Sequence, residues 1–274
     1  MTARFGLTVL MAASLTVFAG SVRADVTLVY DVDVERPEKI EKKVTWHLAE
    51  TRLALVTGGD KAARVFYSVK DSTLTLVDDT KKQYVVLTPE NVATLSTMLA
   101  GMASQMEQVL AGLSPEQREK VAGEMKKRGL EPGEKKSLTI EVLPMSETKN
   151  MHGFTCRKNE VLANGAKAAE VWTTALGPNT VTAAEWAPVN AMVTSLHQVF
   201  DAVSGLTKAF DVEMSLPSSL GRGLEGVPVY VKDLEGDAVK GEMTLTSLKR
   251  GEIDDDVFEI DDDYKKQELT PAEH

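Results

Sequence analysis

The chain has 274 residues and a net charge of −10 at pH 7, with 43% hydrophobic and 26% charged residues. This acidic balance argues against nucleic acids and anionic membrane surfaces as partners, because both are negatively charged. A single cysteine, Cys156, excludes an intrachain disulfide, so the burial of apolar surface has to stabilise the fold.

The first 24 residues have the organisation of a secretory signal peptide. Arg4 provides a short positive region, residues 5–19 are apolar, and Val22 and Ala24 are small residues at the cleavage positions. This segment is too short for a comfortable membrane span, which needs about 20 apolar residues. We expect cleavage after Ala24, a periplasmic or secreted protein without an integral membrane span, and a single domain over residues 25–274. An uncleaved anchor is the alternative, and lipid attachment is excluded because no cysteine lies near the cleavage point.

A series of short strands is predicted between Val26 and Val86. Apolar and polar residues alternate over residues 26–34, and shorter alternating stretches follow at 44–48, 53–55, 65–69, 74–76 and 84–86. Turn-forming residues separate these stretches at 58–60, 70–72 and 78–81. Strands this short and this closely linked predict an antiparallel meander.

A helical insert is predicted over about residues 88–130. Thr88 before Pro89 is a typical helix start, and Ser114 with Gln117 forms a capping box that predicts a second start, with Gly129 as the stop. Apolar residues fall on one helix face. This stripe consists of Val92, Leu95, Leu99, Met102, Met106, Val109, Leu110 and Leu113.

The remaining chain alternates between strands and a second helical insert. Strands are predicted at residues 138–142, 154–162, 168–174, 227–234, 239–248 and 257–260, followed by a polar tail over 264–274. Asn164-Gly165 predicts a tight hairpin between two of them. The second insert is predicted over about residues 188–210, with an amphipathic pattern. Its stripe consists of Val189, Met192, Val193, Leu196, Val199, Phe200, Val203, Leu206 and Phe210.

These elements predict an α+β protein. One antiparallel sheet has an apolar face that needs a cover, and the two inserts are the elements with apolar stripes long enough to provide it. We expect a strongly curved, unclosed sheet that holds the helices in its concavity. Whether the cover is tight or leaves a cavity stays open at this stage.

The residues facing the sheet from the inserts are the candidate site for a hydrophobic ligand. Methionines at 98, 102, 106, 125 and 192 suit an adaptable pocket, although a packed helix core is the favoured interpretation. The candidate ligand-binding residues are Leu95, Leu99, Met102, Met106, Leu196, Val199 and Phe200.

Residues that carry chemistry are scattered. The four histidines do not have the spacing of a metal site, and no Ser-His-Asp pattern, nucleophile elbow or phosphate loop occurs. Cys156 beside Arg157 is either a reactive thiol or a small buried strand residue. The acidic runs 254–256 and 261–263 suit either Ca²⁺ or a solvated turn, but lack the spacing of a calcium loop. We expect no enzyme, no metal and no cofactor.

Several short strings resemble a family of secreted bacterial proteins of unknown function. They are Asp78 to Tyr84, Gly153 to Cys156, Glu170 to Trp172, Gly226 to Pro228, and Val257 to Ile260 with Tyr264 to Lys266. In the closing string Asp262 stands where the family usually has proline.

This family is in turn similar to the LolA-like superfamily of periplasmic lipoprotein carriers. The resemblance implies an unclosed barrel around lid helices and binding of acyl chains or lipoproteins without catalysis. No arginine here matches the one that those carriers use in lid closure. The leading hypothesis is therefore a hydrophobic ligand or lipoprotein bound between sheet and helices. The alternatives are an interaction or sensor module with a filled core, and a hydrolase of unrecognised type.

Overall fold

The computed structural model describes residues 25–34, 40–58, 63–114, 116, 117, 120, 139–207 and 223–268. The signal peptide predicted over residues 1–24 lies outside the described residues. So does most of the chain between Ser114 and Thr139, where the second part of the first helical insert is predicted.

The described chain forms one open sheet of twelve strands, in the order β12-β6-β5-β4-β3-β2-β1-β11-β10-β9-β8-β7. All neighbouring strands are antiparallel except β12 and β6, which are parallel. The strands are β1 Val26–Val34, β2 Ile40–Leu48, β3 Arg52–Thr57, β4 Ala63–Ser68, β5 Thr73–Asp78, β6 Gln83–Leu87, β7 Ile140–Met151, β8 Phe154–Ala163, β9 Ala166–Thr174, β10 Val227–Glu235, β11 Ala238–Arg250 and β12 Lys265–Gln267.

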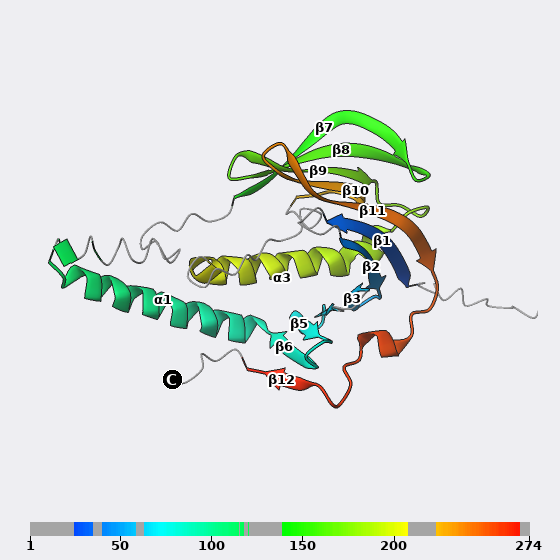
Figure 1. Cartoon of the computed structure of the whole chain (residues 1–274). Helices are drawn as coiled ribbons and strands as arrows, with labels where there is room; N and C mark the ends of the chain where they lie inside the picture. Colours follow the sequence, from blue (N-terminus) through cyan, green and yellow to red (C-terminus); the bar gives the residue numbers. More distant parts are fainter. Residues whose placement is uncertain are drawn as a thin grey trace, which may run out of the picture.

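The predicted antiparallel, curved and unclosed sheet is confirmed, and its first six strands form the expected meander. Two long helices accompany it in the described residues, α1 Pro89–Ala111 and α3 Ala183–Thr207. With so little helix beside twelve strands, the described chain is mainly β rather than the α+β class expected. Figure 1 shows α3 inside the curve of the sheet, with α1 leaving the end of β6 and running beside α3.

The helices differ in how they meet the sheet. Helix α3 contacts β2, β3 and β4, whereas the main partner of α1 is α3. The helical cover expected from both inserts is therefore supported for α3 on the inner face, by which we mean the face that packs against α3. None of the helices among the described residues has the length and apolar character needed to cross a membrane.

The core on the inner face is filled beneath the first half of α3. Trp186 of α3 stacks on Trp46 of β2 with ring centroids 5.9 Å apart and an interplanar angle of 17°. Tyr30 lies against Trp46 and donates its hydroxyl to the Pro228 carbonyl at 3.1 Å. Burial raises the pKa of Tyr30, since ionisation would place a charge in the core. Met192 is fully buried in the same cluster, so the packed-core interpretation holds for that methionine.

Helix α3 begins five residues before the predicted start at Pro188. Thr182 and Glu185 form a capping box, in which the Thr182 amide donates to Glu185 Oε2 at 2.6 Å and the Glu185 amide donates to Thr182 Oγ1 at 3.3 Å. Pro188 therefore lies inside the helix, where it removes one backbone hydrogen bond. The predicted end at Phe210 lies outside the described residues, and the described helix runs to Thr207.

The end of the chain also differs from the prediction. Residues 257–260 do not form a strand, because Asp254 accepts from the Asp256 amide and caps a 3₁₀ turn, η2 Asp255–Phe258. In the predicted polar tail, residues 265–267 form β12, which adds to the edge of β6. Strand β7 continues past residue 142 to Met151, with a bulge after Pro144.

The start of α3 carries a pH-dependent contact with the sheet. Burial favours a high pKa for the Glu185 carboxyl, but hydrogen bonds from Arg250 and Thr182 outweigh burial and hold this pKa below its ordinary value of 4.5. Below the ordinary value the unfolded chain therefore binds more protons at this position than the folded chain. The stability that Glu185 contributes is present above that value and is lost as the pH falls through the lower folded-state pKa.

We predict that Glu185→Gln lowers the free energy of unfolding at neutral pH and flattens its decline in acid. Urea unfolding of both proteins at a series of pH values measures the gap between them, which should shrink as the pH falls below the ordinary carboxyl pKa. Glu252→Gln, at an exposed position, serves as the control and should leave the pH profile unchanged. A gap that stays constant with pH would contradict the assigned role of Glu185.

Candidate ligand-binding site

A partly open pocket of about 450 Å³ lies where α1 and α3 meet the ends of β5 and β6. Its apolar side chains come from two strands and both helices, and its polar side chains are hydroxyls and one amide. The lining consists of Ser72, Leu74, Leu87, Thr88, Pro89, Val92, Ala93, Ser96, Ser195, Gln198 and Val199. We call this the α1–α3 pocket.

The first turn of α1 is fixed to the sheet at the mouth of the α1–α3 pocket. The Asn91 amide donates to Thr88 Oγ1 at 3.2 Å, and the Thr88 amide donates to Asn91 Oδ1 at 2.8 Å. Asn91 Nδ2 also donates to the Val86 carbonyl at 2.7 Å. The predicted start at Thr88 is confirmed, and the reciprocal bonds place Val92 over the end of β6.

The wall formed by α3 is tied to the inner face by a hydroxyl pair. Tyr67 of β4 and Ser195 of α3 lie 3.0 Å apart, oxygen to oxygen. Since Ser195 and Val199 are one helical turn apart, this bond also positions Val199, whose side chain is 9% exposed.

A second, smaller pocket of about 270 Å³ lies on another side of α1, against β12. Its lining includes Leu95 and Met98 of α1, but also the charged residues Glu90, Lys266 and Glu268. Its volume falls just below the range of about 300–1,000 Å³ typical of small-molecule sites. The α1–α3 pocket is the better candidate.

Of the seven predicted site residues, three have side chains in the described part of the structure, and these three have different surroundings. Val199 lines the α1–α3 pocket, Leu95 lines the second pocket, and Leu196 is partly buried against the main core. The backbones of Leu99, Met102, Met106 and Phe200 belong to the two helices, but their side chains lie outside the described part of the structure.

Sequence reasoning missed the strand side of the pocket. Leu74 and Leu87 are paired neighbours on β5 and β6. Their place in one pocket with residues of both helices depends on contacts between distant parts of the chain, which the sequence pattern does not show. Val92 belongs to the predicted stripe of the first insert, so the pattern contained a signal for it. Ser96 and Ser195 interrupt the apolar patterns and gave no signal.

Cys156 and the histidines, the other residues considered for chemistry, lie in separate parts of the chain. Cys156 is fully buried on β8, and burial raises the pKa of its thiol, so the buried interpretation is confirmed. Within the described ranges no group of three or more His, Cys, Asp or Glu residues is arranged to hold a metal ion. His47, His152 and His197 lie on β2, in the β7–β8 turn and on α3, and His274 lies outside the described residues.

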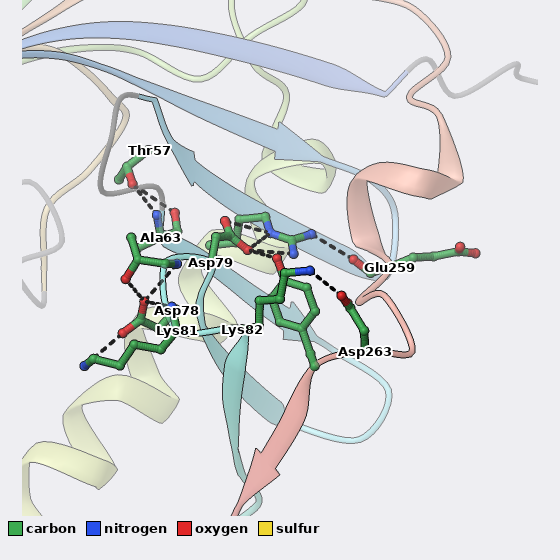
Figure 2. A network of polar contacts seen from close by, with 11 residues as sticks. Thr57, Ala63, Asp78, Asp79, Lys81, Lys82, Glu259 and Asp263 are labelled. Atoms are coloured by element: carbon green, nitrogen blue, oxygen red, sulfur yellow. Dashed lines mark hydrogen bonds and ion pairs between the residues drawn. The ribbon is translucent and has the colours of Figure 1, made fainter.

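The acidic runs near the C-terminus pair with basic side chains of the sheet. Asp255 of η2 accepts from Arg52 at 2.5 Å, and Asp263 forms an ion pair with Lys82 (Figure 2). These acids thus fasten the end of the chain to the outer face of the sheet, opposite α3.

Two of the strings on which the resemblance rests meet on the outer face, where Arg64, Asp79, Glu259 and Tyr264 form a hydrogen-bonded network that we call the clasp. Asp79 accepts hydrogen bonds from Arg64 Nη2 at 2.8 Å and from the Tyr264 hydroxyl at 2.9 Å, and Arg64 Nη1 donates to the Glu259 carbonyl at 2.9 Å. Both Arg64 and Asp79 are largely buried, at 17% and 20% side-chain exposure. Phe258 covers the outer face in the same region, next to Phe66. The strings around Asp79 and Tyr264 therefore help to hold residues 258–264 against the sheet.

The Glu-x-Trp string has a similar explanation. Trp172 is buried on β9 and donates its indole N–H to Glu170 at 3.0 Å. Lys158 of β8 in turn approaches Glu170 at 3.1 Å and lies over the Trp172 ring. Glu170 of this string therefore accepts the hydrogen bond of the buried Trp172 indole, and Lys158 balances the charge of the Glu170 carboxylate.

Taken together, the described residues define a mainly β protein with an open, curved sheet and a pocket between two helices and the strand ends. No protein-family model matches the chain, and no curated protein matches it.

Three similar solved structures illustrate how distant the likeness is. An uncharacterised conserved protein from Thermus thermophilus has 6% identity and a TM-score of 0.42, with 90% of this chain and 91% of that chain covered. PNGF-II has 10% identity and a TM-score of 0.39, with 90% and 31% covered. MucB has 8% identity and a TM-score of 0.37, with 89% and 59% covered. The chain thus spans only 31% of PNGF-II and 59% of MucB, and these likenesses carry no functional argument.

Proposed function

We propose that this chain is an exported, non-enzymatic envelope protein that binds a hydrophobic ligand, either a lipid acyl chain or a lipoprotein, in the α1–α3 pocket. The observation that carries this proposal is the pocket itself. Its volume of about 450 Å³ lies in the range of small-molecule sites, and apolar side chains converge on it from four elements.

The position of the helices gives further support. In a LolA-like arrangement the ligand would lie between an unclosed sheet and its lid helices, and a pocket lined by α1, α3 and the ends of β5 and β6 is compatible with such a position. Helix α1 has few contacts with strands beyond its first turn, so it is the element best suited to move as a lid. Export rests on the signal-peptide pattern of residues 1–24.

One observation favours the alternative, an envelope interaction or sensor module with a filled core. Strand β7 ends the sheet and exposes Leu143 and Met145, at 42% and 40%. An edge strand with exposed apolar residues is a typical surface for pairing with another chain. Such a function would not depend on the α1–α3 pocket, and this difference separates the two candidates.

We predict that Ser96→Trp abolishes ligand uptake by filling the pocket from α1. Binding of Nile red, an uncharged fluorescent dye, should weaken by at least about tenfold, which corresponds to about 1.4 kcal/mol. Native mass spectrometry of gently purified protein should show bound lipid on the wild type and only the bare mass on the variant.

Thr97→Trp is the matched control. Thr97 is exposed on α1, outside the lining of both pockets, and receives the same large side chain one residue further along. It should bind the dye like the wild type. If neither the wild type nor the control takes up dye or lipid, the hydrophobic-ligand function is wrong.

A further inference from the structure

The lining of the α1–α3 pocket contains no charged side chain among the described residues. Its polar groups are the hydroxyls of Ser72, Thr88, Ser96 and Ser195 and the amide of Gln198. Charged residues are found instead around the second pocket, at Glu90, Lys266 and Glu268. The described lining of the α1–α3 pocket thus provides hydrogen-bonding groups but no charged group that could pair with an ionised ligand.

A ligand with an ionised head group would lose hydration in the α1–α3 pocket without gaining an ion pair from the described lining. A carboxylate that enters a half-enclosed site loses water, and the described lining has no Lys, Arg or His to compensate that loss. The net charge of −10 adds a general repulsion for anions. A primary amine would likewise find no carboxylate in this lining.

The polar groups of the pocket differ in how far they are already engaged. Thr88 Oγ1 accepts from the Asn91 amide, and the Ser195 hydroxyl pairs with Tyr67. The side chains of Ser96 and Gln198 form no hydrogen bond with any other described residue. Ser96 lies on α1 and Gln198 on α3, so both helices that form the pocket can donate to and accept from the same head group.

The apolar part of the lining consists of aliphatic side chains from β5, β6 and both helices. Leu74 and Leu87 are buried at the ends of β5 and β6, and Val199 is buried on α3. Together with Val92 of α1 they form the apolar surface against which an alkyl chain would be removed from water. The pocket therefore pairs an apolar wall with neutral hydrogen-bonding groups.

Resting on the proposed function, we infer that the ligand of the α1–α3 pocket is an acyl chain whose head is uncharged and bears hydroxyl or amide groups. The chain lies against Leu74, Leu87, Val92 and Val199, and the head is bound by Ser96 and Gln198. Free fatty acids are disfavoured, because their carboxylate would meet no cation among the described lining residues. A monoacylglycerol has this chemistry, and so does the glyceryl and amide-linked head of an acylated lipopeptide.

Displacement of Nile red from the full mature chain tests the inference. The competitors are monooleoylglycerol, a synthetic triacylated lipopeptide with an uncharged peptide, oleate and oleylamine, each below its aggregation concentration and at a mildly alkaline pH that ionises oleate. At least one neutral competitor should bind at least about tenfold more tightly than oleate and oleylamine. The neutral competitor that binds more tightly identifies the source of the head group.

A charge introduced at Ser96 provides the decisive variant. Ser96→Lys supplies the missing cation, so it should reverse the preference and make oleate the tighter ligand. Thr97→Lys, outside the lining, adds the same charge to α1 and should keep the wild-type preference. This control distinguishes a local counterion from a change in overall charge.

The results that would overturn the proposed function differ from those that would overturn the head-group assignment. If the wild type does not bind Nile red, the proposed function itself fails. If Nile red binds but oleate competes as well as or better than both neutral competitors, or if no competitor displaces the dye, a hydrophobic site remains and the assigned head-group chemistry is overturned. An unchanged preference in Ser96→Lys would also overturn it.

Discussion

Replacing Gly226 with alanine is expected to destabilise the protein strongly, whereas the same change at Gly223 is expected to cost much less. Gly226 has φ +90°, and a Cβ there would lie 2.3 Å from the Thr174 carbonyl oxygen. That oxygen belongs to the backbone of β9, which pairs with β10 at this point, so it cannot move aside. Positive φ and the clash together should cost roughly 2–5 kcal/mol.

The variant at Gly223 measures the cost of a positive φ without the cost of a Cβ clash. Its φ is +89°, almost the same as that of Gly226, but a Cβ there would meet nothing within 4 Å. Gly223→Ala should therefore cost only the conformational strain, about 1–2 kcal/mol. Thermal and urea unfolding of both variants measures the difference. Equal losses would show that the approach of Gly226 to β9 is not the reason for glycine at this position.

The Gly226 result explains one of the strings on which the family resemblance rests. The Gly-Val-Pro string lies where β10 begins beside β9, and Pro228 occupies a bulged register there. Its glycine is required by a close backbone approach, just as Asp79 and Tyr264 are required by the clasp on the outer face. A resemblance built on such strings describes how the sheet is held together. It gives no information on what the pocket binds.

The sequence was most informative where local chemistry decides the structure. The alternation of residues 26–34 corresponds to β1, and Asn164-Gly165 forms the predicted hairpin with φ of +52° and +80°. Ser114 and Gln117 make the predicted capping box, with the Ser114 amide donating to Gln117 Oε1 at 3.1 Å. Period-two patterns and turn residues act over a few positions, so they are visible in a single chain.

Features that depend on distant contacts were not predictable in the same way. Strand β12 has only exposed residues, and it meets β6 where the Lys265 amide donates to the Lys82 carbonyl at 2.9 Å, a contact between positions 183 residues apart. The early start of α3 has a local signal, the Thr182 and Glu185 capping box, but Pro188 pointed to a later start. The candidate site required the sheet order, because Leu74 and Val199 are 125 positions apart in the numbering.

The position of α3 links the core to the pocket. Trp186, Val189 and Met192 anchor the first half of this helix in the filled core, while Ser195 and Val199 continue along the same helix into the pocket wall. A helix behaves as a rigid rod over this length, about 20 Å from Trp186 to Val199 at about 1.5 Å per residue. A substitution at Trp186 should therefore alter the position of Ser195 and Val199 in the pocket wall.

We predict that Trp186→Ala both destabilises the protein and weakens ligand binding. Trp186 is 4% exposed and stacked on Trp46, so its truncation should cost about 3–5 kcal/mol through lost contacts and a cavity. Because α3 then loses its main anchor, Nile red affinity should fall several-fold even in conditions where the variant remains folded. Urea unfolding and dye titration of the same preparation measure the two effects.

Trp172→Ala is the matched comparison for this prediction. Trp172 has a similar burial, 5% exposed, in the same core cluster, but it lies on β9 rather than on α3. Its truncation should cost a comparable free energy of unfolding and leave dye affinity unchanged in the folded protein. Equal affinity in both variants would mean that the packing of α3 on Trp46 does not set the shape of the α1–α3 pocket. A selective loss in Trp186→Ala would show that the filled half of the core holds the pocket wall in place.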